Sequence, residues 1–205
     1  VRAPDVPLTG LPLLAESERA QVVREWNDTA RERPRLLHLW DLFARHVRER
    51  PGAPALVWDQ PRGETRLTYA ELAAAVDPLA RRLRDLGVGI DVPVAFCLER
   101  GIGRIVAILA IFKAGGGYVP FDPAWPADRL AWILESCGAP VLITEEAFLE
   151  RFAEYRGTLL VVDEEKDLKD PKDGKSLVSK SFGSFGSFDS QGQGIAYILY
   201  TSGST

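Results

Sequence analysis

Apolar stretches of strand length alternate with helix-like stretches along most of this chain, and that alternation constrains its fold more than any other feature. Residues 92–98 are apolar enough for a strand that is buried on both faces. Residues 102–112 are apolar on nearly every side, which predicts a buried helix. Another helix is expected around Phe148 and Phe152. Further strands are expected at residues 55–58, 65–67, 118–121, 141–143 and 159–162. This alternation predicts an α/β fold with a mainly parallel sheet, helices on both faces, and ligands at the carboxyl ends of the strands.

The helices in this pattern carry start and stop signals in the sequence. Thr68 and Glu71 form a capping box, in which the hydroxyl and the carboxylate each satisfy a free amide at the start of a helix. Gly87 provides the left-handed residue that ends this helix. Pro126 is expected as the first residue of a later helix, which Gly138 closes. The buried face of the helix after Thr68 is predicted to be Leu72, Val76, Leu79, Leu83 and Leu86.

The chain before the alternating body reads as a separate lead-in. A short helix is predicted over residues 16–26, and the helix after it is expected to end at Pro51. The apolar face of that second helix is formed by Leu36, Trp40, Phe43 and Val47. We therefore expect residues 1–34 to be an interdomain segment and residues 35–205 to be part of one domain.

Residues 163–194 break the alternation. They contain five of the six lysines in the chain and the short repeat Ser181-Phe-Gly-Ser-Phe-Gly-Ser-Phe188. Such a composition buries little apolar surface, so this segment is predicted to be a long, disordered loop inside the domain. Residues 195–200 then return to strand character.

The composition argues against several classes of protein. A net charge of -4 gives no basic surface for nucleic acid. No run approaches the roughly 18 apolar residues of a membrane-spanning helix, and residues 1–9 lack the layout of a signal peptide. We therefore expect a cytoplasmic protein that binds neither nucleic acid nor membrane, with Cys97 and Cys137 as buried free thiols. The absence of methionine predicts a segment of a longer protein.

Thr201-Ser-Gly-Ser-Thr205 follows the last predicted strand and is the strongest candidate for a binding site. Small residues bring backbone amides and hydroxyls close to a phosphate, and Gly203 can adopt a positive φ. An ordinary polar turn is the competing interpretation of this segment. No catalytic residue and no metal ligand can be assigned, because His38 and His46 have no cysteine or aspartate pattern near them.

Two other glycine-containing segments are not expected to bind a nucleotide. Gly174-Lys-Ser176 resembles the end of a Walker loop, but Lys169 stands where that motif needs a glycine. Gly115-Gly-Gly117 lies between a helix and a strand, whereas a dinucleotide fingerprint lies between a strand and a helix. We expect the three glycines to end the helix and to let Tyr118 begin a closely packed strand.

Three motifs and an upstream segment occur in a defined order. The motifs are Leu67-Thr-Tyr-Ala-Glu-Leu72, then Phe112-Lys-Ala-Gly-Gly-Gly-Tyr-Val-Pro-Phe-Asp-Pro123 continued by Trp125-Pro-Ala-Asp-Arg-Leu130, and finally Ile195-Ala-Tyr-Ile-Leu-Tyr-Thr-Ser-Gly-Ser-Thr205. Together they resemble the amino-terminal part of nonribosomal peptide synthetase adenylation domains, which belong to the acyl-adenylate-forming superfamily. The upstream residues 11–30 resemble the end of the linker that joins a condensation domain to an adenylation domain. The resemblance covers nearly the whole chain except about residues 166–193.

The resemblance implies that this chain is the incomplete N-terminal portion of the large adenylation subdomain. It implies a parent enzyme that uses ATP with Mg²⁺ to convert an amino acid to aminoacyl-AMP, and then loads it onto the phosphopantetheine of a downstream carrier domain. A condensation domain is expected upstream. In the family, the β,γ-phosphates of ATP would be held by Thr201, Ser202, Gly203, Ser204 and Thr205. The amino-acid pocket, the Mg²⁺ ligand and the catalytic lysine are expected beyond this sequence, and neither Lys175 nor Lys180 is a candidate for that lysine.

Two alternatives to this interpretation stay open at this point. In the first, the chain is a truncated product that serves as a structural or interaction piece. In the second, it is part of an acyl-CoA ligase. The upstream linker and the Tyr118-Val-Pro120 segment favour the peptide-synthetase branch over the acyl-CoA ligases.

Overall fold

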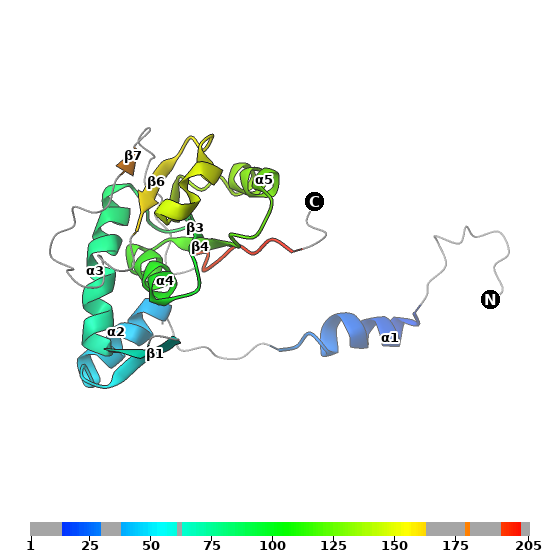
Figure 1. Ribbon diagram of the computed structural model, residues 1–205. Helices are drawn as coiled ribbons and strands as arrows, with labels where there is room; N and C mark the ends of the chain where they lie inside the picture. The colour runs from blue at the N-terminus through cyan, green and yellow to red at the C-terminus, as the bar shows by residue number, and fades with distance from the viewer. Residues whose placement is uncertain (1–13, 30–37, 61–62, 163–178, 181–193, 202–205) are drawn as a thin grey trace. The chain divides into compact units, whose positions relative to one another are not determined.

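The computed structural model describes residues 14–29, 38–60, 63–162, 179–180 and 194–201. The chain divides into two compact units, Val1–Arg35 and Leu36–Thr205 (Figure 1). The interpretation of residues 1–34 as an interdomain segment, and of residues 35–205 as part of one domain, stays a prediction.

The described part of the first unit is a short helical segment. The α-helix α1 (Glu16–Ala20) continues directly as the π-helix η2 (Gln21–Glu25), so the helix expected over residues 16–26 is present but changes its hydrogen-bond pattern after one turn. The Ala15 N–H donates to Glu18 Oε2 at 2.7 Å, which satisfies one free amide at the helix start. Val23 and Trp26 are exposed on this segment.

The second unit is organised around a five-stranded sheet. The strand order is β4 (Gly117–Phe121), β3 (Pro93–Cys97), β5 (Val141–Thr144), β6 (Thr158–Val161) and β7 (Ser179–Lys180). The first four strands are parallel and β7 is antiparallel to β6, which confirms the predicted mainly parallel sheet. In the segment predicted to be a disordered loop, residues 163–178 and 181–193 lie outside the described residues, so that prediction is not tested.

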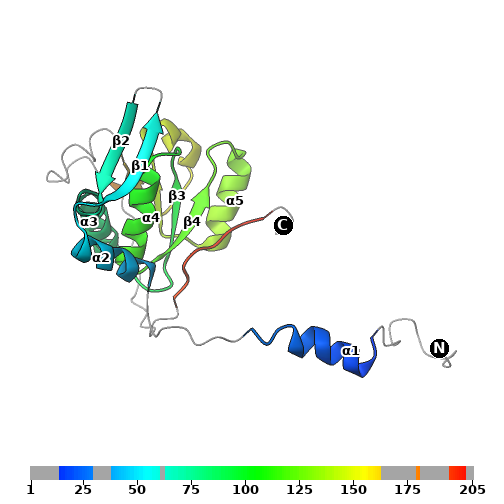
Figure 2. The same cartoon turned by 90° about the horizontal axis from the view of Figure 1, so that it is seen from below.

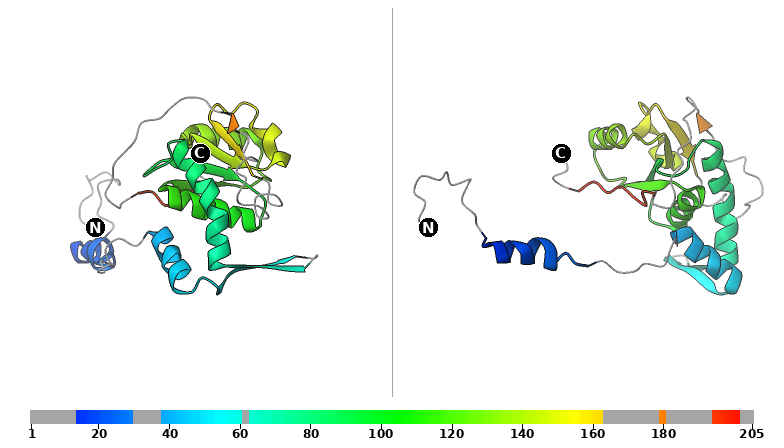
Figure 3. Two further views of the ribbon diagram at one scale, coloured as in Figure 1. Left: turned by 90° about the vertical axis from the view of Figure 1, so that its left-hand side faces the viewer. Right: turned by 180° about the vertical axis from the view of Figure 1, so that it is seen from behind.

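Helices cover both faces of the sheet, as the alternation predicted. On one face, α3 (Tyr69–Asp85) and α4 (Ile102–Ala114) build the larger hydrophobic cluster, against which α2 (Leu39–Glu49) also packs. On the other face, α5 (Ala127–Cys137) and the 3₁₀-helix η3 (Glu146–Phe152) build a second cluster. Figure 3 shows α4 and α5 on opposite sides of β4. The helix expected around Phe148 and Phe152 is therefore present as a 3₁₀-helix.

A separate hairpin precedes the sheet. β1 (Pro54–Gln60) and β2 (Gly63–Thr68) pair antiparallel and form a two-stranded sheet of their own. The two short strands predicted here are confirmed, while Pro61 and Arg62 between them lie outside the described residues. Gly63, with φ of 126°, begins β2 in a conformation that glycine adopts without strain.

The predicted start and stop residues of the helices are confirmed, except that one helix begins a residue later than predicted. The Thr68 hydroxyl accepts the Glu71 N–H at 3.3 Å, and Glu71 Oε2 accepts the Thr68 N–H at 2.8 Å. Gly87 and Gly138 have φ of 82° and 60°, as expected for left-handed stops. Pro126, with ψ of 146°, is extended and precedes α5 rather than opening it, so the helix begins one residue later than predicted.

The three glycines between α4 and β4 have the structural roles that the sequence predicted. Gly115 ends α4 in the left-handed conformation, with φ of 97°. At Gly116 a Cβ would lie 2.8 Å from Val88 Cγ1 and 2.9 Å from the Val92 carbonyl oxygen. Only glycine therefore lets the chain pass between these neighbours and enter β4.

Candidate functional site

Residues 194–201, called the edge segment from here on, run parallel to β4 along the outer side of the sheet (Figure 2). The Tyr118 N–H donates to the Ala196 carbonyl at 3.1 Å, and the Ile198 N–H donates to the Tyr118 carbonyl at 2.9 Å. These are the two alternating bonds of a parallel ladder centred on Tyr118. The strand predicted for residues 195–200 is therefore present as an extended segment with one isolated β-bridge, between Tyr118 and Tyr197, and not as a regular strand.

The start of the edge segment is fixed by Asp91. The Ile195 N–H donates to Asp91 Oδ1 at 2.7 Å. Asp91 itself has φ of 61°, a left-handed conformation that aspartate tolerates better than most residues. Gly117 allows close approach at the same place, because a Cβ there would lie 2.6 Å from the Ile195 carbonyl oxygen. Neither contact was predicted from the sequence.

Aromatic side chains hold the middle and the end of the edge segment. The ring of Tyr197 stacks on that of Tyr118, with centroids 5.6 Å apart. Burial, and then the neighbouring Tyr197, raise the pKa of the Tyr118 phenol above its ordinary value, so this hydroxyl is protonated at neutral pH. The Tyr200 O–H donates to Ser136 Oγ of α5 at 3.1 Å, and the Trp132 ring meets the Tyr200 ring edge-on at 5.8 Å.

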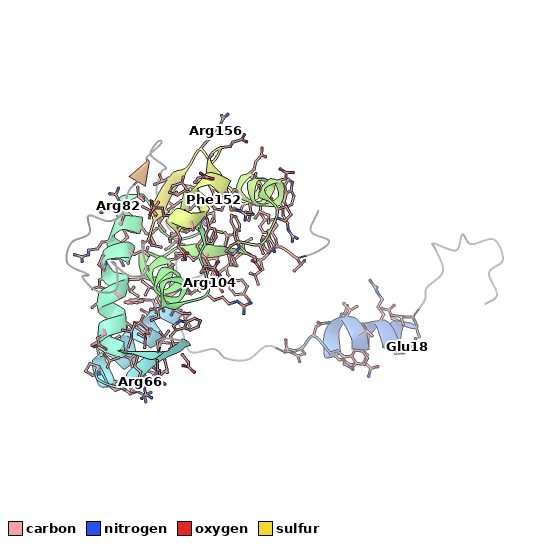
Figure 4. All side chains as sticks on the ribbon, viewed as in Figure 1. Glu18, Arg66, Arg82, Arg104, Phe152 and Arg156 are labelled. Carbon is pink, nitrogen blue, oxygen red and sulfur yellow. The ribbon has the colours of Figure 1, made fainter. Side chains whose placement is uncertain are left out.

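The loops at the carboxyl ends of β3 and β5 are tied to each other. The Glu99 N–H, just after β3, donates to Oε1 of Glu145, just after β5, at 2.9 Å. Arg104, in the first turn of α4, donates to the Leu98 carbonyl. Figure 4 labels Arg104 on α4 and Phe152 on η3. These contacts fix the edge of the sheet at which ligands of parallel α/β proteins bind.

The loop after β4 is clamped by an arginine from η3. Arg151 donates to the Pro123 carbonyl at 2.6 Å and also to the carbonyl of Trp125. The guanidinium of Arg129 lies over the Trp125 ring, 4.5 Å from its centroid. Phe121, the last residue of β4, stacks on a phenylalanine of η3. The segment resembling the second family motif is therefore held at the carboxyl edge by contacts from η3 and α5.

Cys97 ends β3 close to this edge but is not a nucleophile. Its carbonyl accepts the Thr144 hydroxyl at 3.1 Å, and its side chain is buried. Burial raises the pKa of the Cys97 thiol from its ordinary value of 9.0 to about 12. The thiol is therefore protonated at neutral pH and behaves as a small apolar side chain, as expected, whereas Cys137 is only partly buried.

The predicted phosphate-binding residues are only partly described. Thr201 is exposed and follows the anchored Tyr200 directly. Ser202, Gly203, Ser204 and Thr205 lie outside the described residues, so their grouping with Thr201 stays a prediction. Within residues 14–29, 38–60, 63–162, 179–180 and 194–201, no group of three histidine, cysteine or acidic side chains is placed to hold a metal ion. Among the helices described in the same ranges, none is both long and apolar enough to cross a membrane.

Neither histidine takes part in this edge of the sheet. His46 accepts a hydrogen bond from the Arg50 side chain and packs against Tyr69, with ring centroids 5.4 Å apart. His38 immediately precedes α2 and is exposed. Lys175 lies outside the described residues, and Lys180 belongs to β7.

Comparison with known protein families identifies the family of the domain that contains this edge of the sheet. The family described as AMP-binding enzyme matches residues 43–205. This chain belongs to the AMP-binding enzyme family. The match begins in α2 and includes the whole described sheet, the edge segment and the Thr201–Thr205 sequence.

The curated relatives of this AMP-binding chain include peptide synthetases. It is 38% identical over 205 residues to gramicidin S synthase 2 of Brevibacillus brevis, a match that covers 100% of this chain and 4% of that protein. It is 34% identical over 202 residues to tyrocidine synthase 3 of Brevibacillus parabrevis, covering 98% of this chain and 3% of that protein. The chain thus spans only a small fraction of the length of these relatives.

Solved structures point to the same branch. The chain resembles the nonribosomal peptide synthetase FmoA3 bound to alpha-methyl-L-serine-AMP, with a TM-score of 0.65 and 31% identity over 91% of this chain and 19% of that one. The AMPPNP-bound form of FmoA3 gives a TM-score of 0.65 and 32% identity, covering 92% of this chain and 18% of the other. The resemblance to nonribosomal peptide synthetase adenylation domains is confirmed.

Sequence reasoning missed the contacts that hold the edge segment. One signal was present: a proline at position 120, inside a strand, is typical of an edge. A second signal was the spacing of Trp132 and Ser136, which lie four residues apart and so share one face of a helix. Neither signal names Tyr200 as the partner.

Proposed function

We propose that the full-length protein activates an amino acid with ATP for nonribosomal peptide synthesis, and that this chain contributes the binding loop for the β,γ-phosphates. In this proposal the phosphates are held by Thr201, Ser202, Gly203, Ser204 and Thr205. Membership of the AMP-binding enzyme family and the similarity to peptide synthetases support the reaction class.

The observation that carries the proposal is the parallel course of the edge segment beside β4. Parallel strands end at the same edge of a sheet, so the chain reaches Thr201 at the edge where β3, β4 and β5 also end. Ligands of open α/β sheets bind at this edge. The segment that starts there is rich in hydroxyls and contains a glycine, a composition suited to a cradle of amide and hydroxyl donors for phosphate.

The reaction is a displacement at phosphorus. A carboxylate oxygen of the amino acid attacks the α-phosphorus of ATP, the bond from that phosphorus to the bridging oxygen breaks, and pyrophosphate leaves with the electron pair. Aminoacyl-AMP is the product. The hydroxyls and amides of residues 201–205 would hold the leaving pyrophosphate in line and stabilise the charge that it gains.

ATP would enter with Mg²⁺, whose charge offsets that of the phosphates. The donor set of residues 201–205 fits phosphate oxygens, since it offers hydroxyl and amide hydrogens and no carboxylate. In the second half-reaction, the phosphopantetheine thiol of a carrier domain would attack the carbonyl of aminoacyl-AMP, forming a thioester and releasing AMP.

We infer the remaining partners from the same relatives. Gramicidin S synthase 2 matches the whole of this chain with only 4% of its own length, so a related full-length protein has room for a condensation domain before the adenylation domain and a carrier domain after it. A cytoplasmic location is proposed because Cys97 and Cys137 are both unpaired, as is usual in a reducing compartment.

The test is exchange of labelled pyrophosphate into ATP by the full-length protein, with each amino acid in turn. We expect exchange that depends on one or a few amino acids. The Ser202→Ala variant should lower kcat/KM for ATP by about 10-fold to 100-fold, because it removes one donor to the leaving group. Ser17→Ala, a change of the same type at an exposed position in α1, should leave it unchanged.

Other outcomes would redirect the assignment. Exchange that depends on a carboxylic acid without an amino group, followed by coenzyme A acylation, would favour the acyl-CoA ligase alternative. If no acid supported exchange, the proposal would fail and a structural or interaction piece would be the better account.

A further inference from the structure

The ladder between the edge segment and β4 is interrupted just before the proposed phosphate-binding loop. Tyr118 makes two backbone hydrogen bonds to the edge segment: its N–H donates to the Ala196 carbonyl, and its carbonyl accepts the Ile198 N–H. In a parallel ladder the next bond would run from the N–H of residue 120 to the carbonyl of Ile198. Residue 120 is Pro120, which has no N–H, so this bond cannot form.

Beyond the last hydrogen bond of the ladder, the edge segment is held by side chains of α5. Tyr200 lies two residues beyond Ile198, and its O–H donates to Ser136 Oγ at 3.1 Å. The ring of Trp132 meets the Tyr200 ring at 83° with centroids 5.8 Å apart, the edge-to-face arrangement that aromatic pairs favour. Trp132 and Ser136 lie one helical turn apart, so α5 holds both the ring and the hydroxyl of Tyr200 from one face.

The helix that supplies these contacts is itself firmly placed. Leu130, Ile133 and Leu134 of α5 are buried in the second hydrophobic cluster, and Gly138 ends the helix. By contrast, Trp132 and Ser136 are exposed on the outer face of α5, so their side chains are not required to fill the core. Their described partner is Tyr200, the residue directly before Thr201.

We infer that Trp132 and Ser136 are positioning residues for the phosphate-binding loop. By holding Tyr200 where Pro120 interrupts the ladder, they fix the direction in which the chain leaves the sheet toward Thr201. This inference rests on the proposed function, because it takes residues 201–205 to bind the phosphates of ATP. It concerns the binding of ATP alone, since the pocket for the amino acid is expected beyond this sequence.

The experiment measures pyrophosphate exchange by the full-length protein, with separate KM values for ATP and for the amino acid. Ser136→Ala and Trp132→Ala should each raise the KM for ATP by about threefold to tenfold, the range expected for one hydrogen bond or one aromatic pair. The KM for the amino acid should stay unchanged. Tyr200→Phe, which removes only the hydroxyl, should match Ser136→Ala, and combining the two should add nothing further.

Matched variants separate positioning from a loss of structure. Ser136→Thr keeps a hydroxyl and Trp132→Phe keeps a ring, so the KM for ATP of each variant should lie closer to the wild-type value than that of the corresponding alanine variant. Glu135→Ala shortens the neighbouring exposed residue of α5 and should have no effect. Hydrogen exchange of the peptide covering residues 194–205 should accelerate in Ser136→Ala and Trp132→Ala but not in Glu135→Ala.

Three results would overturn the inference. The first is an unchanged KM for ATP in Ser136→Ala, Trp132→Ala and Tyr200→Phe. The second is a fall in kcat with both KM values unchanged, which would indicate only a smaller fraction of folded enzyme. The third is equal hydrogen exchange in all variants. Failure of the proposed function is recognised separately, because the wild-type protein would then show no exchange of pyrophosphate at all.

Discussion

Gly117 is the position at which one added carbon atom tests how the edge segment is held against β4. A Cβ on this residue would lie 2.6 Å from the carbonyl oxygen of Ile195 and 3.2 Å from its Cγ2. Backbone oxygen cannot rotate out of the way as a flexible side chain can. The Gly117→Ala variant must therefore push the start of the edge segment away from β4 by a few tenths of an ångström.

The size of the effect follows from the contacts that this displacement strains. The edge segment is joined to β4 by hydrogen bonds of 3.1 Å and 2.9 Å, donated by the amides of Tyr118 and Ile198. Overpacking of this kind costs about 1–3 kcal/mol. We therefore expect the free energy of local opening at this edge to fall by about 1–3 kcal/mol, which lowers the protection of the two amides from hydrogen exchange by about 5-fold to 150-fold.

The assay is hydrogen exchange of the full-length protein, followed on the peptides that contain Tyr118 and Ile198. Gly52→Ala is the matched control, because a Cβ on Gly52 would meet nothing within 4 Å. That variant should leave both amides as protected as in the wild type. If Gly117→Ala exchanged no faster than Gly52→Ala at these amides, the edge segment would not be packed on β4 as described.

Three further predictions concern the stability of the unit that carries the site. Thr68→Ala removes the hydroxyl that accepts the Glu71 N–H and should lower the free energy of unfolding in urea by about 1 kcal/mol; an unchanged value would contradict the cap. Phe96→Ala empties a buried position in β3, an inner strand of the sheet, and should cost about 3–5 kcal/mol, so a loss under about 1 kcal/mol would contradict its burial. Burial raises the pKa of the Cys97 thiol from 9.0 to about 12, so the unfolded chain loses this proton at a lower pH than the folded one. The stability that the buried, protonated thiol contributes is therefore complete below pH 9 and is lost as the pH rises from about 9 to about 12. At pH 8 a thiol reagent should label Cys97 only on unfolding and the half-buried Cys137 sooner; equally fast labelling of both would be inconsistent with this burial.

Local signals made much of the fold predictable from the sequence. The strand ending at Cys97 and the helix after it are apolar on nearly all sides because most of their side chains are buried. The capping box at Thr68 acts within four residues, as do the left-handed glycines at the ends of α3 and α5. Features that depend on neighbours in the sequence need no knowledge of the rest of the fold, so they were confirmed.

The contacts of the edge segment could not be predicted in the same way, because they join distant parts of the chain. Asp91 and Ile195 are 104 residues apart, and Tyr200 and Ser136 are 64 residues apart. No local pattern states which aspartate or serine lies beside a given strand once the sheet has formed. Similarly, α1 continues as a π-helix without a proline or glycine in η2 to indicate the change.

The central claim is that residues 201–205, at the end of the anchored edge segment, bind the phosphates of ATP. A crystal structure of the full-length protein with a non-hydrolysable ATP analogue tests it most directly. The account predicts β- and γ-phosphate oxygens within hydrogen-bond distance of the Ser202, Ser204 and Thr205 hydroxyls or of nearby backbone amides. Phosphates bound at another part of the sheet, with residues 201–205 turned away from them, would contradict it.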